Sequence, residues 1–482
     1  MTNSPSVSIQ RLPTSRYFAF LVGALSAALA SLFVVAHWSA AVLGGLLILV
    51  LSALESEPFL LLVLFLLPVG WLLKGNNVLV HDVMTSARGL VVIGFFVGRF
   101  LRGELGISRF LRSSVSRWSL AFGGAALLSV MLGTGGFTHN SARSLALIAS
   151  SLCFYLVMLV WVDSHQRMRR VLQVLLCSAI FTAGFAIFQT IVGGYTSLWL
   201  YLYPPDEKLA LWDWRVTSFL NYPNTLAGYL NLILPFALAC YALGAGKWRK
   251  LGGWAVALGF VALAMTQSRA GLVAFGCVLV CAVFLFIESW RRRLLLLGGL
   301  AVFIAGFYLV GRILSPARLG EIDVAEALSR PILWVTAWNL FLRSPLCGIG
   351  IGNFTLFHGP YIQISWIPTD DLTVNNLYFE VLSETGIIGF IVFFGLVTVA
   401  IRSGYRTFIS ATTALGKALG FGVFGAMVTI LVHGTLDLTL DVSPQFDTLF
   451  WMMLALLVAY IRLQSRPLAA PGSFSTLSTD RI

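Results

Sequence analysis

Two arginines lie beside apolar blocks of the sequence rather than in its basic clusters. Arg269 occupies the turn 268–271 between two such blocks, with almost no loop to carry it into water, and Arg215 lies shortly before another block. A guanidinium is planar and suits paired phosphate oxygens, and an ionisable group at membrane depth is a functional candidate. The alternatives are a surface ion pair of Arg215 with Asp213, and extension of the flexible Arg269 side chain to interfacial water.

An acidic pair begins the apolar block 377–400. Asn376, Glu380 and Glu384 follow one another at intervals of four residues, which places them on one face of a helix. Such a stripe is costly in lipid and is expected to face the bundle interior or a wet cavity, where a carboxylate could serve as a general base. The alternative is a helix cap at Asn376 followed by acids that the helix dipole favours.

His433 and Asp437 are also four residues apart, at the end of the block 414–434. They could handle a proton together or form a hydrogen-bonded structural lock, and we favour the lock. The glycine-rich run 348–352 has the composition of a phosphate loop but lacks its strand and helix context, so nucleotide binding is not expected. The six cysteines lack metal-ligand spacing and five lie in apolar blocks, so we predict no disulfide, no zinc, no other metal site and no cofactor.

The elements that carry these residues are membrane helices. Of 482 residues, 58% are apolar and 11% charged, and mean hydropathy is +0.88, whereas soluble domains average about 45–50% apolar and about 25% charged. The apolar residues form blocks long enough to cross a bilayer as helices. This excludes a soluble enzyme, a disordered chain, a disulfide scaffold and an outer-membrane barrel. We predict a single all-α polytopic membrane domain over 1–482.

Fourteen apolar blocks are candidates for spans, and the short pair 39–55 and 58–73 makes twelve spans plus a hairpin equally consistent. Their approximate ranges are 17–36, 39–55, 58–73, 86–102, 118–133, 144–163, 171–192, 225–245, 253–268, 271–289, 295–313, 377–400, 414–434 and 447–462. With the N-terminus inside, most of the 32 basic residues fall in inner loops. Both termini are therefore predicted to be cytoplasmic, and the net charge of +12 needs no nucleic acid.

Two long loops are then extracytoplasmic. Residues 193–224 and 314–376 are rich in Trp, Tyr, Gly and Pro and poor in charge, which predicts packed structure and an outward-facing active surface. Within the second loop, Arg330, Trp334 and Trp338 recur every four residues. This spacing predicts a short amphipathic helix along the membrane face.

Several of these pieces together resemble the O-antigen ligase and polymerase family of bacterial inner-membrane glycosyltransferases. The order and spacing of the pieces around one large outer loop carry the resemblance. The pieces are residues 219–229, the turn 268–271, Arg330 with Trp334, residues 344–354, residues 376–378 with 384–389, and His433 with Asp437.

The resemblance implies transfer of a glycan from undecaprenyl diphosphate to an acceptor glycan or lipid A core. The reaction would be a metal-independent, inverting displacement at the periplasmic face of the inner membrane. The family's diphosphate-binding arginines correspond to Arg215, Arg269 and Arg330. We expect Asn376, Asn224, His433 and Asp437 to support the site.

One position departs from the family's pattern. Ligases commonly carry His-Asn where this chain has Asn375-Asn376, and Asn375 cannot accept a proton at neutral pH. A polymerase, or a member with another base, is therefore favoured over a ligase. Candidates for the base are Glu380, Glu384, His358 and the pair at 370–371, with Asn375 left to orient the substrate.

The alternative from another class is a membrane transporter of a small anion such as bicarbonate, in which the Glu380–Glu384 stripe would serve ion coupling. Transporters often contain repeats and broken helices, and the sequence shows no internal repeat. The large outer loop favours surface chemistry over transport.

Overall fold

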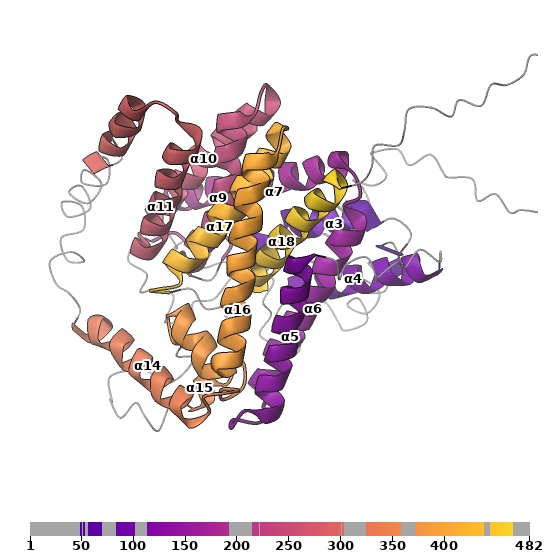
Figure 1. The fold of residues 1–482 in the computed structure, drawn as a ribbon, viewed down its shortest axis with the longest axis vertical. Helices are drawn as coiled ribbons and strands as arrows, with labels where there is room; N and C mark the ends of the chain where they lie inside the picture. The colour runs from indigo at the N-terminus through magenta and orange to yellow at the C-terminus, as the bar shows by residue number, and fades with distance from the viewer. Residues whose placement is uncertain are drawn as a thin grey trace, which may run out of the picture.

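All the regular secondary structure in the part of the chain that the structure describes is helical (Figure 1). The structure is a computed structural model, and it describes residues 49–50, 52–53, 56–69, 83–101, 113–191, 215–220, 222–299, 301–302, 324–357, 373–437 and 444–465. The predicted all-α membrane architecture is confirmed for these residues.

Eight helices of the described residues are long and apolar enough to cross a membrane. They are α5 (Ser114–Leu132), α6 (His139–Trp161), α7 (His165–Ile191), α9 (Pro223–Leu243), α11 (Arg269–Phe286), α16 (Leu377–Ser410), α17 (Ala414–His433) and α18 (Pro444–Gln464). Three further helices are α3 (Ser56–Phe65), α4 (Val83–Leu101) and α10 (Lys247–Met265). The predicted block 17–36, most of 39–55 and most of 295–313 lie outside the described residues.

The centre of the bundle is the contact between α9 and α17, where small residues let the helices approach closely. A Cβ added at Gly422 would lie 2.1 Å from the Phe236 ring, and one at Gly425 would lie 2.7 Å from Pro235. Glycine at such positions allows the close packing on which helices in lipid depend, because lipid itself supplies no hydrophobic drive between them. α9 is buried along most of its length.

Connections that are distant in sequence meet at one end of the bundle, which we call the loop end. Thr134 N donates to Gly348 O (3.2 Å), Val216 N to Met265 O (3.4 Å) and Leu377 N to Gly434 O (2.8 Å). The loop end thus gathers the described parts of both long predicted loops, together with the turn between α10 and α11.

The described part of the second long loop has a small core of its own. It contains α14 (Val324–Arg343), in the stretch where the spacing of Arg330, Trp334 and Trp338 predicted a helix, and α15 (Phe354–Phe357). Leu333, Ala337 and Leu340 of α14 cluster with Ile349 and Phe354, and both helices lie at the bottom of Figure 1, near the lower end of α16. Burial of these side chains fixes α14 against the start of α16.

Candidate functional site

Arg215 is hydrogen-bonded to the turn between α10 and α11, the turn after which Arg269 begins α11. Arg215 Nε donates to Thr266 O (2.7 Å), and its Nη2 donates to Asn224 Oδ1 (2.6 Å) in the first turn of α9. Arg269 begins α11 three residues after Thr266. We call these four residues the arginine corner. The structure therefore brings together two arginines that the sequence places on separate segments.

Arg269 is exposed at the first residue of α11. A cation at this position opposes the helix dipole, whose positive end lies at the N-terminus, so the charge does not serve helix stability. Ser268 caps the helix by accepting a hydrogen bond from Gly271 N (3.3 Å). The guanidinium and the first turn of α11 together present positive potential to an anion at the loop end.

The segment that carries Arg215 is held by a residue that sequence reasoning did not single out. Gln189, 7% exposed in α7, accepts hydrogen bonds through Oε1 from Ser218 N (3.0 Å) and Thr217 N (3.4 Å). Ser218 has a left-handed backbone (φ 54°), and its hydroxyl donates to Thr182 O (2.7 Å). Gln189 is one of two glutamines in the apolar block 171–192, and a side-chain amide in such a block was the available signal.

Asn376 is the N-cap of α16. Its Oδ1 accepts from Tyr378 N (3.0 Å) and Phe379 N (3.1 Å), and its Nδ2 donates to Thr435 O (2.8 Å) after α17. Asn375 precedes it with φ 50°, and its Oδ1 accepts from Thr373 Oγ1 (3.1 Å). The capping alternative therefore describes Asn376, which also ties α16 to the end of α17.

Arg330 and His433 lie beside the same junction. Arg330 Nη1 donates to Leu436 O (3.0 Å). The His433 ring is buried, and neither ring nitrogen has a hydrogen-bond partner among the described residues. Asp437 contacts His433 through its backbone N–H, which donates to His433 O (3.2 Å). A lock through the imidazole, which we favoured from the spacing, is therefore not formed.

Glu384 holds the glycine-rich segment. Its Oε2 accepts from Gly352 N (2.9 Å) and its Oε1 from Phe354 N (3.0 Å), and the side chain is 5% exposed. Residues 344–354, which we call the strap, thus fold onto α16. Both carboxylate oxygens serve as acceptors for backbone amides, which describes a structural anchor better than a general base.

The strap also supplies backbone hydrogen bonds at a break in α16. At Gly386 the backbone leaves the helical region (φ 63°, ψ −170°), and intrahelical hydrogen bonds are lost there. Backbone groups buried in a membrane protein need replacement partners. The strap supplies four: Ile349 N to Ser383 O (2.9 Å), Gly350 N to Glu384 O (2.9 Å), Ile387 N to Pro345 O (2.9 Å) and Ile388 N to Leu346 O (3.3 Å).

Glycine in the strap follows from this close approach. Gly348 has φ 71°, and a Cβ there would lie 2.4 Å from the Glu384 carbonyl. Gly386, which faces it, has φ 63°, and a Cβ there would lie 2.3 Å from Leu346 O. The glycines that resemble a phosphate loop therefore allow backbone to pack on backbone.

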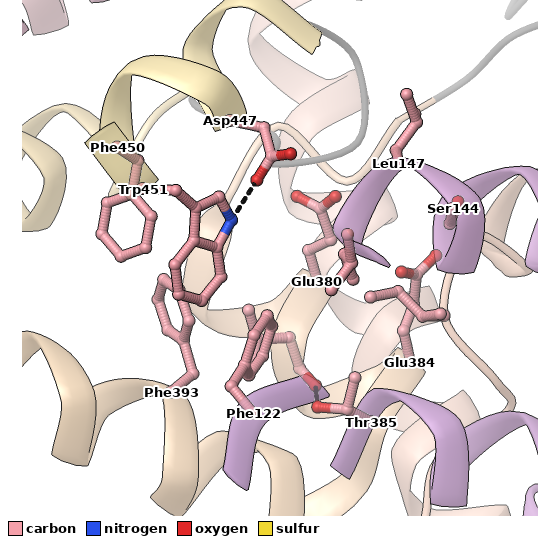
Figure 2. Close-up of a pocket in the computed structure, with 13 residues that line it drawn as sticks. Phe122, Ser144, Leu147, Glu380, Glu384, Thr385, Phe393, Asp447, Phe450 and Trp451 are labelled. Atoms are coloured by element: carbon pink, nitrogen blue, oxygen red, sulfur yellow. Dashed lines mark hydrogen bonds between the residues drawn. The ribbon is translucent and has the colours of Figure 1, made fainter. Parts of the chain in front are cut away.

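Glu380 lines a cavity between α5, α6, α16 and α18 (Figure 2). Asp447, which opens the last predicted span, lines the same cavity, and each of these two residues is 7% exposed. The other lining residues are Phe122, Ser144, Leu147, Ile148, Ile351, Val381, Glu384, Thr385, Phe393, Phe450 and Trp451. Sequence reasoning missed Asp447, although an acid in an apolar block is itself a functional signal.

The candidate residues thus fall into three groups at the loop end. The arginine corner is built on α9, α10 and α11, and the cavity is built on α5, α6, α16 and α18. The junction of α16 with the end of α17 holds Asn375, Asn376, Arg330, His433 and Asp437. Within the described ranges, no group of three or more His, Cys, Asp or Glu side chains is arranged to hold a metal ion. Residues 358 and 370–371 lie outside those ranges.

Part of the chain matches a known protein family. Residues 254–394 match the family model described as O-antigen ligase. The match covers Arg269, Arg330, Asn375, Asn376, Glu380 and Glu384 and leaves out Arg215, Asn224, His433, Asp437 and Asp447. A search of curated proteins finds no match. The family match supports the O-antigen ligase and polymerase family and, with it, a glycan-transferring membrane enzyme.

Proposed function

We propose, on the premise of that family match, that this protein transfers a glycan from a polyprenyl diphosphate to an acceptor glycan. The reaction takes place at the outer face of the inner membrane, with both termini of the chain in the cytoplasm. The product is an extended polysaccharide or a glycan ligated to lipid A core. The observation that supports this proposal most directly is the arginine corner.

The chemistry needs positive charge where the diphosphate leaves. When the bond between the anomeric carbon and the diphosphate oxygen breaks, negative charge grows on the leaving group, and preorganised donors stabilise it. Arg269 offers an exposed guanidinium at the N-terminus of α11, and Arg215 is positioned beside it by Thr266 and Asn224. Arg330 donates a hydrogen bond to Leu436 O just after α17, and it is the third candidate for binding the donor's diphosphate.

The break in α16 favours the transporter alternative, since broken helices in transporters expose backbone groups that coordinate ions. In this protein the strap takes up those groups. Ser383 O and Glu384 O accept from strap amides, and Ile387 N and Ile388 N donate to strap carbonyls. The break therefore anchors a loop, which supports surface chemistry.

The proposal is tested with purified protein in nanodiscs and a glycan linked to undecaprenyl diphosphate. Incubation with donor alone separates polymer growth from ligation, which requires lipid A core as acceptor. We expect release of the polyprenyl diphosphate that accompanies glycan transfer and persists in EDTA. Uptake of bicarbonate into proteoliposomes without any glycan transfer would replace the proposal with the transporter.

A further inference from the structure

The cavity beside α16 contains two carboxylates that come from different helices and face one another. Glu380 lies in the first turn of α16 and Asp447 in the first turn of α18. Figure 2 shows the Glu380 carboxylate pointing toward Asp447. Much of the surrounding wall is apolar, with Phe122, Phe393 and Phe450 among the residues that line it. Two like charges that line one largely apolar cavity repel each other.

Asp447 is held in place by an aromatic neighbour. Trp451 Nε1 donates to Asp447 Oδ1 (2.7 Å), one helical turn away. The Trp451 ring is 1% exposed and packs edge-on against Tyr155 (centroids 6.2 Å apart) and Phe450 (5.1 Å). Because the indole cannot move without disturbing these rings, it fixes the carboxylate toward the cavity.

The cavity has room for water. It offers about 30 Å³ to the centre of a water-sized molecule, whereas one water needs roughly 10–15 Å³. A sugar ring does not fit, whereas water or the hydroxyl tip of a larger ligand does. Carboxylates around such a space accept hydrogen bonds from either one.

We propose that Glu380 and Asp447 form a proton-accepting pair for the acceptor hydroxyl, and that Trp451 is its positioning residue. This inference rests on the proposed glycan transfer. The acceptor hydroxyl oxygen bonds to the donor's anomeric carbon, whose bond to the diphosphate oxygen breaks, and the diphosphate leaves with the electron pair. The hydroxyl proton passes through cavity water to Glu380, whose new O–H donates to Asp447.

Glu384 does not share this role, although it lines the same cavity. Its two oxygens accept from Gly352 N and Phe354 N, so proton uptake there would cost strap contacts. Glu380 and Asp447 thus handle the proton, whereas Glu384 holds the strap against α16.

The test compares Glu380→Gln, Asp447→Asn, the double variant and Trp451→Phe in nanodiscs. Trp161→Phe is the matched control, because the Trp161 ring is equally buried and its indole N–H has no hydrogen-bond partner among the described residues. Thermal unfolding is measured for all variants, independently of activity. We expect each single carboxylate variant to unfold at or above the wild-type Tm. The increase in Tm of the double variant should be smaller than the sum of the two single increases, since either substitution alone removes the repulsion between the carboxylates.

Turnover is then measured against pH. We expect Glu380→Gln to lower kcat about 10²- to 10⁴-fold, the range of general acid–base contributions. Asp447→Asn and Trp451→Phe should change the pH at which activity falls on the acid side, and Trp161→Phe should not. Such pH shifts distinguish proton handling from a purely structural role.

The outcomes separate the two proposals. If the wild type transfers glycan, while the carboxylate variants lower Tm additively and leave the pH profile unchanged, the pair is structural and this inference is wrong. If the wild type transfers no glycan to any acceptor, both proposals fail together. Non-additive Tm shifts with a displaced acid limb support the pair.

Discussion

Arg215 Nε lies 2.7 Å from the backbone oxygen of Thr266, a hydrogen bond across 51 residues of sequence. The bond joins the segment before α9 to the turn that presents Arg269. An arginine on a flexible loop would lose much of its binding energy to ordering. Arg215 is instead positioned by Thr266 and Asn224 before any substrate arrives, as an electrostatic catalyst requires.

We predict that replacing Arg269 lowers turnover alone, whereas replacing Arg215 lowers both turnover and stability. Arg269→Ala should lower turnover about 10²- to 10³-fold without changing Tm, because the exposed side chain supports charge stabilisation only. Arg269→Lys should recover part of this, since a point charge cannot hold two oxygens in a plane. Steady-state turnover of a lipid-linked glycan checks both variants, with Arg291→Ala as control. Full activity of Arg269→Ala would remove it from the donor site.

Arg215→Ala should lower both activity and stability. It removes the hydrogen bonds to Thr266 and Asn224, each worth about 1 kcal/mol or more when a charged group takes part. Thermal unfolding alongside turnover measures the two effects separately. A variant that loses Tm but keeps full turnover would show that Arg215 holds the turn and binds no phosphate.

Glu384→Gln is expected to loosen the strap. The amide group of glutamine would meet a backbone N–H where a carboxylate oxygen accepted one, which leaves a buried donor unsatisfied at about 1–3 kcal/mol. Hydrogen exchange at Gly352 and Phe354 should accelerate and Tm should fall. Glu288→Gln, at an exposed position, is the control. Unchanged exchange at the two strap amides would contradict the anchoring role.

Asn375 is expected to matter for backbone conformation more than for proton transfer. Its φ of 50° lies in the left-handed region, which asparagine and glycine tolerate and other residues disfavour. Asn375→Gly should therefore leave Tm unchanged, whereas Asn375→Ala should lower the free energy of unfolding by about 1 kcal/mol, and with it Tm. Both should retain more turnover than Glu380→Gln, and Asn375→His should stay active. If Asn375→Ala abolishes turnover while Glu380→Gln is fully active, the base lies elsewhere.

The orientation of the bundle can be checked by cysteine labelling. Leu346, in the strap, is 64% exposed, and Trp290, near the opposite end of α11, is 61% exposed. In spheroplasts, which lack the outer membrane but keep the inner membrane sealed, Leu346→Cys should react with an impermeant maleimide. Trp290→Cys should react only after permeabilisation. The wild-type protein measures the background from its native cysteines. The reverse pattern would place the arginine corner in the cytoplasm and exclude a periplasmic donor site.

Helix type and most span positions were accessible from the sequence alone. A run of apolar residues that matches the bilayer thickness must satisfy its backbone internally, so it becomes a helix whatever its neighbours are. The block predicted at 414–434 is α17 (Ala414–His433), and that at 271–289 is α11 (Arg269–Phe286). The spacing of Asn376, Glu380 and Glu384 likewise placed all three on one helix face, where all three are buried.

What each acid of that stripe does was decided by the tertiary structure. Glu384 accepts from amides of the strap 30 and 32 residues earlier, and Glu380 faces an aspartate on another helix. Local periodicity states which face of a helix a residue occupies, but the partners on that face come from chain segments whose approach depends on global packing. The same reason explains why Arg215 bonds to the turn that carries Arg269, far from it in sequence, and why the imidazole of His433 forms no bond to Asp437.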